Sequence, residues 1–127
     1  PILSHVERHP LLRKNPERLC RLVEMGILTQ ITAASVLERF TPQIRDFAVE
    51  LLEHRLAHML VTDSHGMHVR TPKLSAGYEA VKNLIGKNAA DRMVYDVPRD
   101  VIAGKEIFTD DPLPFKKKSW FHFFRKA

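Results

Sequence analysis

The chain has 127 residues, enough for one domain with a substantial core but too few for a closed eight-stranded α/β barrel. Hydrophobic residues make up 44% of it, which excludes wholesale disorder. The net charge of +5 belongs to the C-terminus, where five basic residues occur without an acidic one: Lys116, Lys117, Lys118, Arg125 and Lys126. The other 15 Lys and Arg residues balance the 15 Asp and Glu residues, so we expect no nucleic-acid partner.

A single cysteine, Cys20, excludes an internal disulfide and is typical of a reducing compartment, so we expect a cytoplasmic protein. A cysteine-based phosphatase is excluded, because Gly26 stands six positions after Cys20, where that mechanism needs an arginine. No signal peptide and no membrane-spanning apolar stretch are visible. The chain starts at Pro1 inside a predicted strand, which we interpret as a truncation.

Three strands are predicted, at residues 1–5, 27–31 and 57–62, each a short apolar run. Helices alternate with them. The predicted helices begin at the Asn15-Pro16 and Thr41-Pro42 pairs, at Lys73, at Asn88 and at Pro98, with a short helical stretch over residues 34–40. This alternation is typical of βαβ units with a parallel sheet, so the predicted class is α/β. Because such a sheet would have two open edges, we expect further strands before residue 1.

Carboxylate and imidazole groups follow two of these strands. Asp63 and His65 come directly after the third strand, and His5 follows the first. Because the carboxyl ends of parallel strands share one edge of a sheet, we expect both clusters to face one crevice. This mixture of oxygen and nitrogen ligands suits Mn, Fe or Zn. Arg8 and Arg70 lie just downstream, and their guanidinium groups match the oxygens of a phosphate.

Simpler interpretations of these residues stay open. Asp63 could cap a turn with His65 in solvent, and both arginines could be surface charges. Glu7 could orient its neighbours or be solvated. His54 and His58 have metal-ligand spacing, but we expect structural roles for them, because His58 starts a strand at the end remote from the proposed site. The roles of His9 and His68 stay undefined.

The C-terminal segment interleaves its basic residues with four aromatic ones: Trp120, Phe121, Phe123 and Phe124. One interpretation is a solubilising tail. The other is contact with a partner or with an anionic membrane surface, where basic residues and interfacial aromatics both contribute to binding.

The motifs Ser4-His5-Val6-Glu7-Arg8 and Val61-Thr62-Asp63-Ser64-His65, with Arg70 and the Lys-rich aromatic terminus, resemble a known family. It is the family of bacterial metal-dependent protein-tyrosine phosphatases within the polymerase-and-histidinol-phosphatase (PHP) superfamily, encoded with capsule and exopolysaccharide genes. The resemblance covers the whole chain but only the C-terminal half of such an enzyme. It implies half of a distorted α/β barrel, over residues 1–113, followed by a tail over residues 114–127.

For the site, the resemblance implies a trinuclear, usually manganese cluster, with Fe, Co or Zn as alternatives. His5, Asp63 and His65 would be metal ligands, while Arg8 and Arg70 would bind the substrate phosphate. The family's usual His-Pro-Glu-Arg-Asn motif has Val6 and His9 here in place of its Pro and Asn. An N-terminal His-x-His strand, two further histidines and a bridging glutamate are expected before residue 1.

The function expected from the resemblance is hydrolysis of phosphotyrosine on a protein, such as a cognate tyrosine kinase. We expect the protein in the cytoplasm, with its tail at the inner face of the membrane, and we expect these 127 residues alone to be weakly active or inactive. Two alternatives are a phosphatase of a small monoester such as histidinol phosphate, and an inactive fragment that acts as an interaction module.

Overall fold

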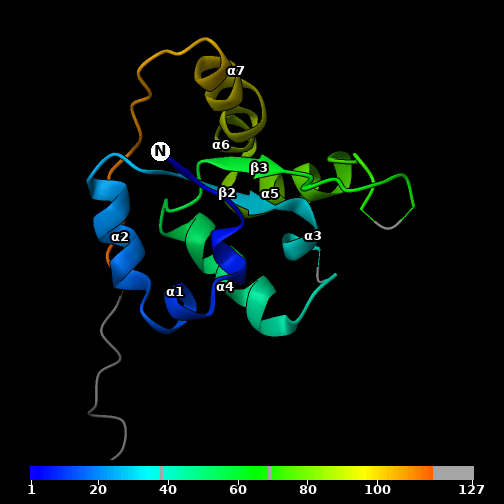
Figure 1. Cartoon of the computed structure of the whole chain (residues 1–127), viewed down its shortest axis with the longest axis horizontal. Coiled ribbons are helices and arrows are strands. Elements are labelled where there is room, and N and C mark those ends of the chain that lie inside the picture. The colour runs from blue at the N-terminus through cyan, green and yellow to red at the C-terminus, as the bar shows by residue number, and fades with distance from the viewer. Residues whose placement is uncertain (38, 69, 116–127) are drawn as a thin grey trace, which may run out of the picture.

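The computed structural model describes residues 1–37, 39–68 and 70–115 and confirms an α/β fold. Three parallel strands form one sheet in the order β1 (Ile2–Leu3), β2 (Leu28–Thr32) and β3 (Met59–Val61) (Figure 1). In the register, Leu3 pairs with Thr29, and Thr32 pairs with Val61. All three carboxyl ends therefore lie at the same edge, as the sequence predicted. The predicted tail from residue 116 onward lies outside the described residues.

The connection from β1 to β2 contains a 3-10 helix, η1 (Val6–Arg8), and two helices, α1 (Pro10–Lys14) and α2 (Pro16–Glu24). Helix α2 begins at the predicted proline, whose missing N–H costs nothing in a first helical turn. The Asn15 side chain, however, makes no capping hydrogen bond. Helix α2 buries Leu19 and Val23.

The connection from β2 to β3 contains α3 (Ala33–Val36) and α4 (Pro42–Glu53). Helix α3 is shorter than the predicted stretch over residues 34–40. Helix α4 begins as predicted, with the Thr41 hydroxyl accepting a hydrogen bond from the Ile44 N–H at 3.4 Å. Its apolar stripe is buried, as the periodicity indicated: Phe47, Ala48, Leu51 and Leu52.

After β3, α5 (Ser75–Ile85) ends at Gly86, whose φ of 88° lies in a region that few other residues adopt. A continuous helical run follows, made of α6 (Lys87–Asp91), the π-helix η2 (Arg92–Asp96) and α7 (Val97–Ile102). The prediction that Asn88 caps a separate helix is wrong, because Gly86 makes the turn and Asn88 lies inside α6. Pro98 lies near the start of α7 and lacks an N–H donor. The wider π-helical turn η2 directly precedes this helix.

The core lies between the sheet and the helices, with α6 and α7 above the sheet and α1 and α4 below it in Figure 1. Leu19, Ile31 and Leu51 are completely buried there. Helices α3 and α5 approach each other closely, because a Cβ atom built on Gly77 would lie 2.5 Å from the Ala33 Cβ. In the part of the chain that the structure describes, no helix has the length and apolar character needed to cross a membrane.

The predicted structural roles of His54 and His58 are confirmed. His58 is buried before β3, and its Nδ1 accepts a hydrogen bond from the Thr29 N–H at 3.0 Å. His54 makes separate contacts: its Nδ1 lies 3.0 Å from the Leu113 carbonyl oxygen, and its ring stacks on Phe115 with centroids 4.0 Å apart. Burial, and secondly the positive charge of Arg92, lowers the pKa of His58 to about 4.

This pKa predicts a loss of stability in mild acid. Between pH 6.5 and 4 the unfolded chain binds a proton at His58 that the folded chain rejects, so the unfolding free energy falls with pH. The original chain should lose about 3 kcal/mol of unfolding free energy between pH 7 and pH 4. We expect His58→Asn, whose amide oxygen can still accept from the Thr29 N–H, to lack this loss. Urea unfolding at both pH values measures the difference.

The control is His68→Gln. Because His68 is exposed, the unfolding free energy of this variant should depend on pH as that of the original chain does. Parallel stability curves for His58→Asn and the original chain would contradict the assignment.

Candidate functional site

The residues that follow β1 and β3 share a cavity of about 460 Å³ at the carboxyl edge of the sheet. Its lining contains all five residues singled out in the sequence, together with two neighbours: His5, Arg8, His9, Pro10, Asp63, His65 and Arg70. The first four come from the loop after β1 and the last three from the loop after β3. The cavity is therefore formed between two loops held by strands on opposite sides of β2.

The carboxylate of Asp63 joins the two loops. Its Oδ2 lies 2.6 Å from Arg8 Nη2 and 3.5 Å from Arg70 Nη1. The Arg8 and Asp63 side chains are only 19% and 20% exposed, so solvent screens this ion pair little. Partial burial alone would raise the pKa of Asp63, but the hydrogen bond and charge of Arg8 outweigh it and hold this pKa below its ordinary value.

The loop from Asp63 to Arg70 closes on itself. The Arg70 carbonyl oxygen accepts from the Ser64 hydroxyl at 2.9 Å and from the His65 N–H at 3.2 Å. His65 Nδ1 lies 2.7 Å from the Asp63 carbonyl oxygen and 3.2 Å from Arg70 Nη1. A carbonyl can only accept, so the shorter contact assigns the proton to Nδ1 and leaves the Nε2 lone pair of His65 free; the Arg70 guanidinium, which can only donate, then lies beside Nδ1 without a hydrogen bond to it.

The backbone turns sharply after both strands. His5 has φ 40° and ψ 48°, and Asp63 has φ 51°, so both occupy the left-handed region without being glycine. Such a conformation costs about 1–2 kcal/mol per residue and is found most often where function holds it in place. The strain aims each loop across the carboxyl edge.

Glu7 fixes the loop after β1 from beneath. Its side chain is completely buried, and its Oε1 accepts from the Thr32 N–H at 3.1 Å and from the Ser35 hydroxyl at 2.7 Å. The solvated interpretation of Glu7 is therefore wrong. The next residue, Arg8, also places its guanidinium 5.2 Å from the centre of the Phe40 ring.

Sequence reasoning missed Thr32, Ser35 and Phe40 as supports of this loop. Thr32 ends β2, while Ser35 lies in α3. For Thr32 and Ser35 the available signal was their position: they are polar residues at the carboxyl end of the central apolar strand, at the edge where the two clusters were expected. Nothing in the sequence indicated which side chain they would hold.

The donor types for a metal are present, but their arrangement differs from a complete site. His5, Asp63 and His65 share the cavity, yet within residues 1–37, 39–68 and 70–115 no group of three or more His, Cys, Asp or Glu side chains is placed to hold an ion. The Asp63 carboxylate pairs with Arg8 instead. Two imidazoles, one with a free Nε2, and a carboxylate fit part of a metal centre.

Comparisons with known proteins show which family the chain resembles. The family model described as capsular polysaccharide synthesis, CpsB/CapC, matches residues 1–103. The tyrosine-protein phosphatase YwqE of Bacillus subtilis is 29% identical over 124 residues, covering 98% of this chain and 48% of that protein. The putative tyrosine-protein phosphatase CapC of Staphylococcus aureus is 32% identical over 130 residues, covering 95% and 48%.

A solved structure is also similar, with a TM-score of 0.84 and 28% identity over 92% of this chain and 47% of the other. It comes from a study of YwqE from Bacillus subtilis and CpsB from Streptococcus pneumoniae, described as metal-dependent tyrosine phosphatases. The chain thus spans about half the length of the relatives it matches.

The buried contacts of Glu7 generate a stability prediction. Glu7→Ala would leave the Thr32 N–H and the Ser35 hydroxyl unsatisfied in the interior, and we expect it to lower the unfolding free energy by at least about 2 kcal/mol. Ser35→Ala should cost less, because the Thr32 bond remains. Urea unfolding measures both, with Glu50→Ala, an exposed position in α4, as the control. Equal stabilities of Glu7→Ala and Glu50→Ala would refute the role of Glu7.

Proposed function

The chain belongs to the CpsB/CapC family of capsular polysaccharide synthesis, and we propose that it forms the phosphate-binding part of a metal-dependent protein-tyrosine phosphatase. The observation that carries the proposal is the pair of guanidinium groups on one cavity. Arg8 and Arg70 come from different loops, and both approach the same anionic oxygen, Asp63 Oδ2. A phosphoryl oxygen is anionic, as that carboxylate oxygen is, and would attract the same two guanidinium groups.

The two arginines would bind and orient the phosphate. A phosphate monoester offers several anionic oxygens, and each charge-assisted hydrogen bond to it contributes about 1.5–3 kcal/mol. Transfer of a phosphoryl group involves little covalent chemistry by the protein, so positioning and neutralising its charge are the main contributions required. Arg8 is held rigidly by its Phe40 and Asp63 contacts, whereas Arg70 is 43% exposed and more adjustable.

His5, Asp63 and His65 would hold the metal, and the free Nε2 of His65 supports this assignment. When bound, such a metal would lower the pKa of a water molecule toward about 7 and supply a nucleophile for phosphorus. We propose manganese, with Fe, Co or Zn as alternatives, in a trinuclear cluster whose other ligands lie outside these 127 residues. The limited number of donors described here supports that division.

The remaining parts of the proposal concern the whole protein. Residues 1–113 would be the C-terminal part of a PHP-type barrel and residues 114–127 a basic aromatic tail. The protein would act in the cytoplasm, with the tail at the inner membrane face, on a phosphotyrosine protein such as a cognate tyrosine kinase. The parallel sheet supports the α/β class of this part, and the names of the relatives support a phosphotyrosine protein as the substrate.

A second candidate is a chain without activity of its own that acts as an interaction module. It is favoured by one observation: the described residues include no three-ligand group for an ion. Metal analysis of the full-length protein separates the candidates, because a catalytic site should retain manganese with the help of His5, Asp63 and His65, and an inactive interaction module should not.

The arginines generate the activity prediction. In the full-length enzyme, we expect Arg70→Met to lower kcat/KM on a phosphotyrosine peptide, with manganese present, by about 10- to 150-fold, the loss of one charge-assisted bond. Its unfolding free energy should change little, since Arg70 is exposed. Arg21→Met, on the exposed face of α2, is the control and should leave the rate unchanged.

Unchanged hydrolysis by Arg70→Met would remove that residue from the proposed role. A faster rate on histidinol phosphate than on the peptide would instead assign the site to a small phosphate monoester.

A further inference from the structure

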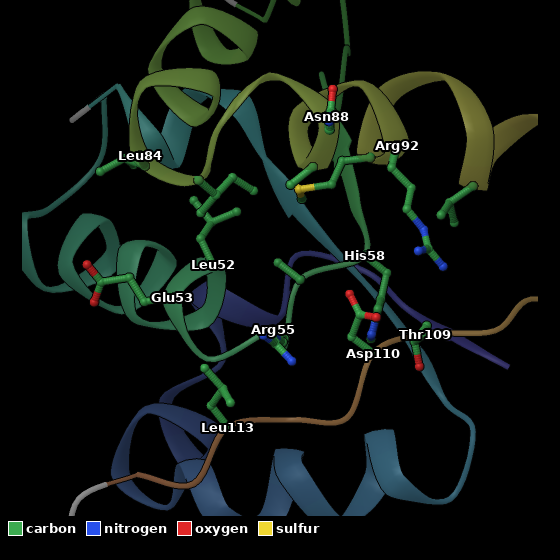
Figure 2. Close-up of a pocket in the computed structure, with 15 residues that line it drawn as sticks. Leu52, Glu53, Arg55, His58, Leu84, Asn88, Arg92, Thr109, Asp110 and Leu113 are labelled. Carbon is green, nitrogen blue, oxygen red and sulfur yellow. The ribbon is translucent and has the colours of Figure 1, made fainter.

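A second cavity, of about 640 Å³, lies at the end of the sheet opposite the Asp63 cavity (Figure 2). His58, which directly precedes β3, lines it, whereas Asp63 follows the end of the same strand. The walls come from the C-terminal ends of α4 and α5, from α6 and η2, and from residues 109–113. This volume is ordinary for a site that binds a small molecule.

His58 presents an unused hydrogen-bond donor to this cavity. A backbone N–H can only donate, so the bond from Thr29 makes Nδ1 the acceptor and assigns the ring proton to Nε2. The side chain is 7% exposed, and Nε2 is buried without a hydrogen-bond partner among the described residues. Since the pKa of His58 is about 4, the ring is neutral at pH 7 and keeps this proton. A buried donor left without an acceptor is costly, so an acceptor supplied by a ligand would bind favourably.

The charge beside this donor is positive. Arg92 lies close enough to His58 to disfavour its protonation, and Figure 2 shows its guanidinium extending from η2 on the same side of the cavity. Arg92 also donates a hydrogen bond to the Phe108 carbonyl oxygen, which attaches the segment before Thr109 to η2. A cation cannot accept from Nε2–H or pair with Arg92, and an anionic acceptor bonds a guanidinium more strongly than a neutral one, so this end of the cavity favours an anionic acceptor.

Part of the cavity lining is apolar. Leu52, Ile85 and Met93 contribute to it from three different helical segments, and Ala89 is an exposed member of the lining. Two carboxylates also line the cavity, but Glu53 points away from His58 in Figure 2, and Asp110 is exposed. The cavity thus combines an apolar body with one polar end, as sites for small organic acids do.

We propose that this cavity binds a small carboxylate with an apolar body, which accepts a hydrogen bond from His58 Nε2–H, pairs with Arg92 and packs against Leu52, Ile85 and Met93. The site is independent of the phosphatase proposal, because it shares no residue with the Asp63 cavity. It gives His58 a role as a binding residue in addition to its bond with β2.

The test uses the full chain and the probe 4-phenylbutyrate, with 4-phenylbutanol as a neutral probe of the same shape. Calorimetry measures binding, and NMR of histidine labelled with nitrogen-15 reports the His58 Nε2–H. We expect saturable binding of the carboxylate, a shift of that signal, and at least tenfold weaker binding of the alcohol.

Two variants and one control complete the design. His58→Asn keeps an acceptor for Thr29 but removes the donor that reaches the cavity, and Ala89→Phe fills the cavity from an exposed position of α6. Each should weaken binding of the carboxylate at least tenfold. Arg99→Met, on α7 and outside the cavity lining, should leave it unchanged.

The proposal is overturned if the alcohol binds as tightly as the carboxylate, if neither variant weakens binding, or if no saturable binding occurs. It is equally overturned if the NMR signal shows Nε2–H already bonded to Asp110 in the chain without probe. Because Ala89 lies on the surface, its variant decides the question even where His58→Asn fails to fold.

Discussion

A buried carboxylate holds the carboxyl edge of this sheet together. Glu7 accepts hydrogen bonds from the last residue of β2 and from α3, and this fixes the η1 turn in which it lies. The neighbouring Arg8 then extends over the edge to Asp63, beyond β3. One series of charge-assisted contacts therefore crosses all three strands. Because such bonds are stronger than neutral ones and partly shielded from solvent, the position of each loop depends on the other.

This arrangement accounts for the strained backbone at both strand ends. The left-handed conformations of His5 and Asp63 are unfavourable in isolation, and the Glu7 and Arg8 contacts offset that cost. The Arg8 guanidinium is consequently ordered by contacts within the chain, with Asp63 Oδ2 and with the Phe40 ring.

Much of this edge could be predicted from the sequence, because parallel strands bring their carboxyl ends together whatever the details of packing. Short apolar runs followed by His5 or by Asp63 and His65 were enough to place those residues on one cavity. The helix starts at Pro16 and Pro42 were equally visible, since proline restricts the backbone locally.

What could not be predicted depends on contacts between distant segments. A glutamate between His5 and Arg8 has the sequence pattern of a surface residue, and only the packing of α3 reveals its burial. The donor state of His58 likewise depends on Thr29, which is 29 residues away. The continuous run from α6 to α7 was missed because a proline normally interrupts a helix, and here a π-helical turn directly precedes α7.

The close approach of Gly77 to Ala33 has an evolutionary consequence. Any side chain at position 77 would push α5 away from α3, and α3 carries the Ser35 hydroxyl that Glu7 requires. The packing that orders the Glu7 turn thus depends on a glycine that does not line the Asp63 cavity. Across homologues, positions 33 and 77 should covary in size, with one of the pair enlarging only where the other shrinks.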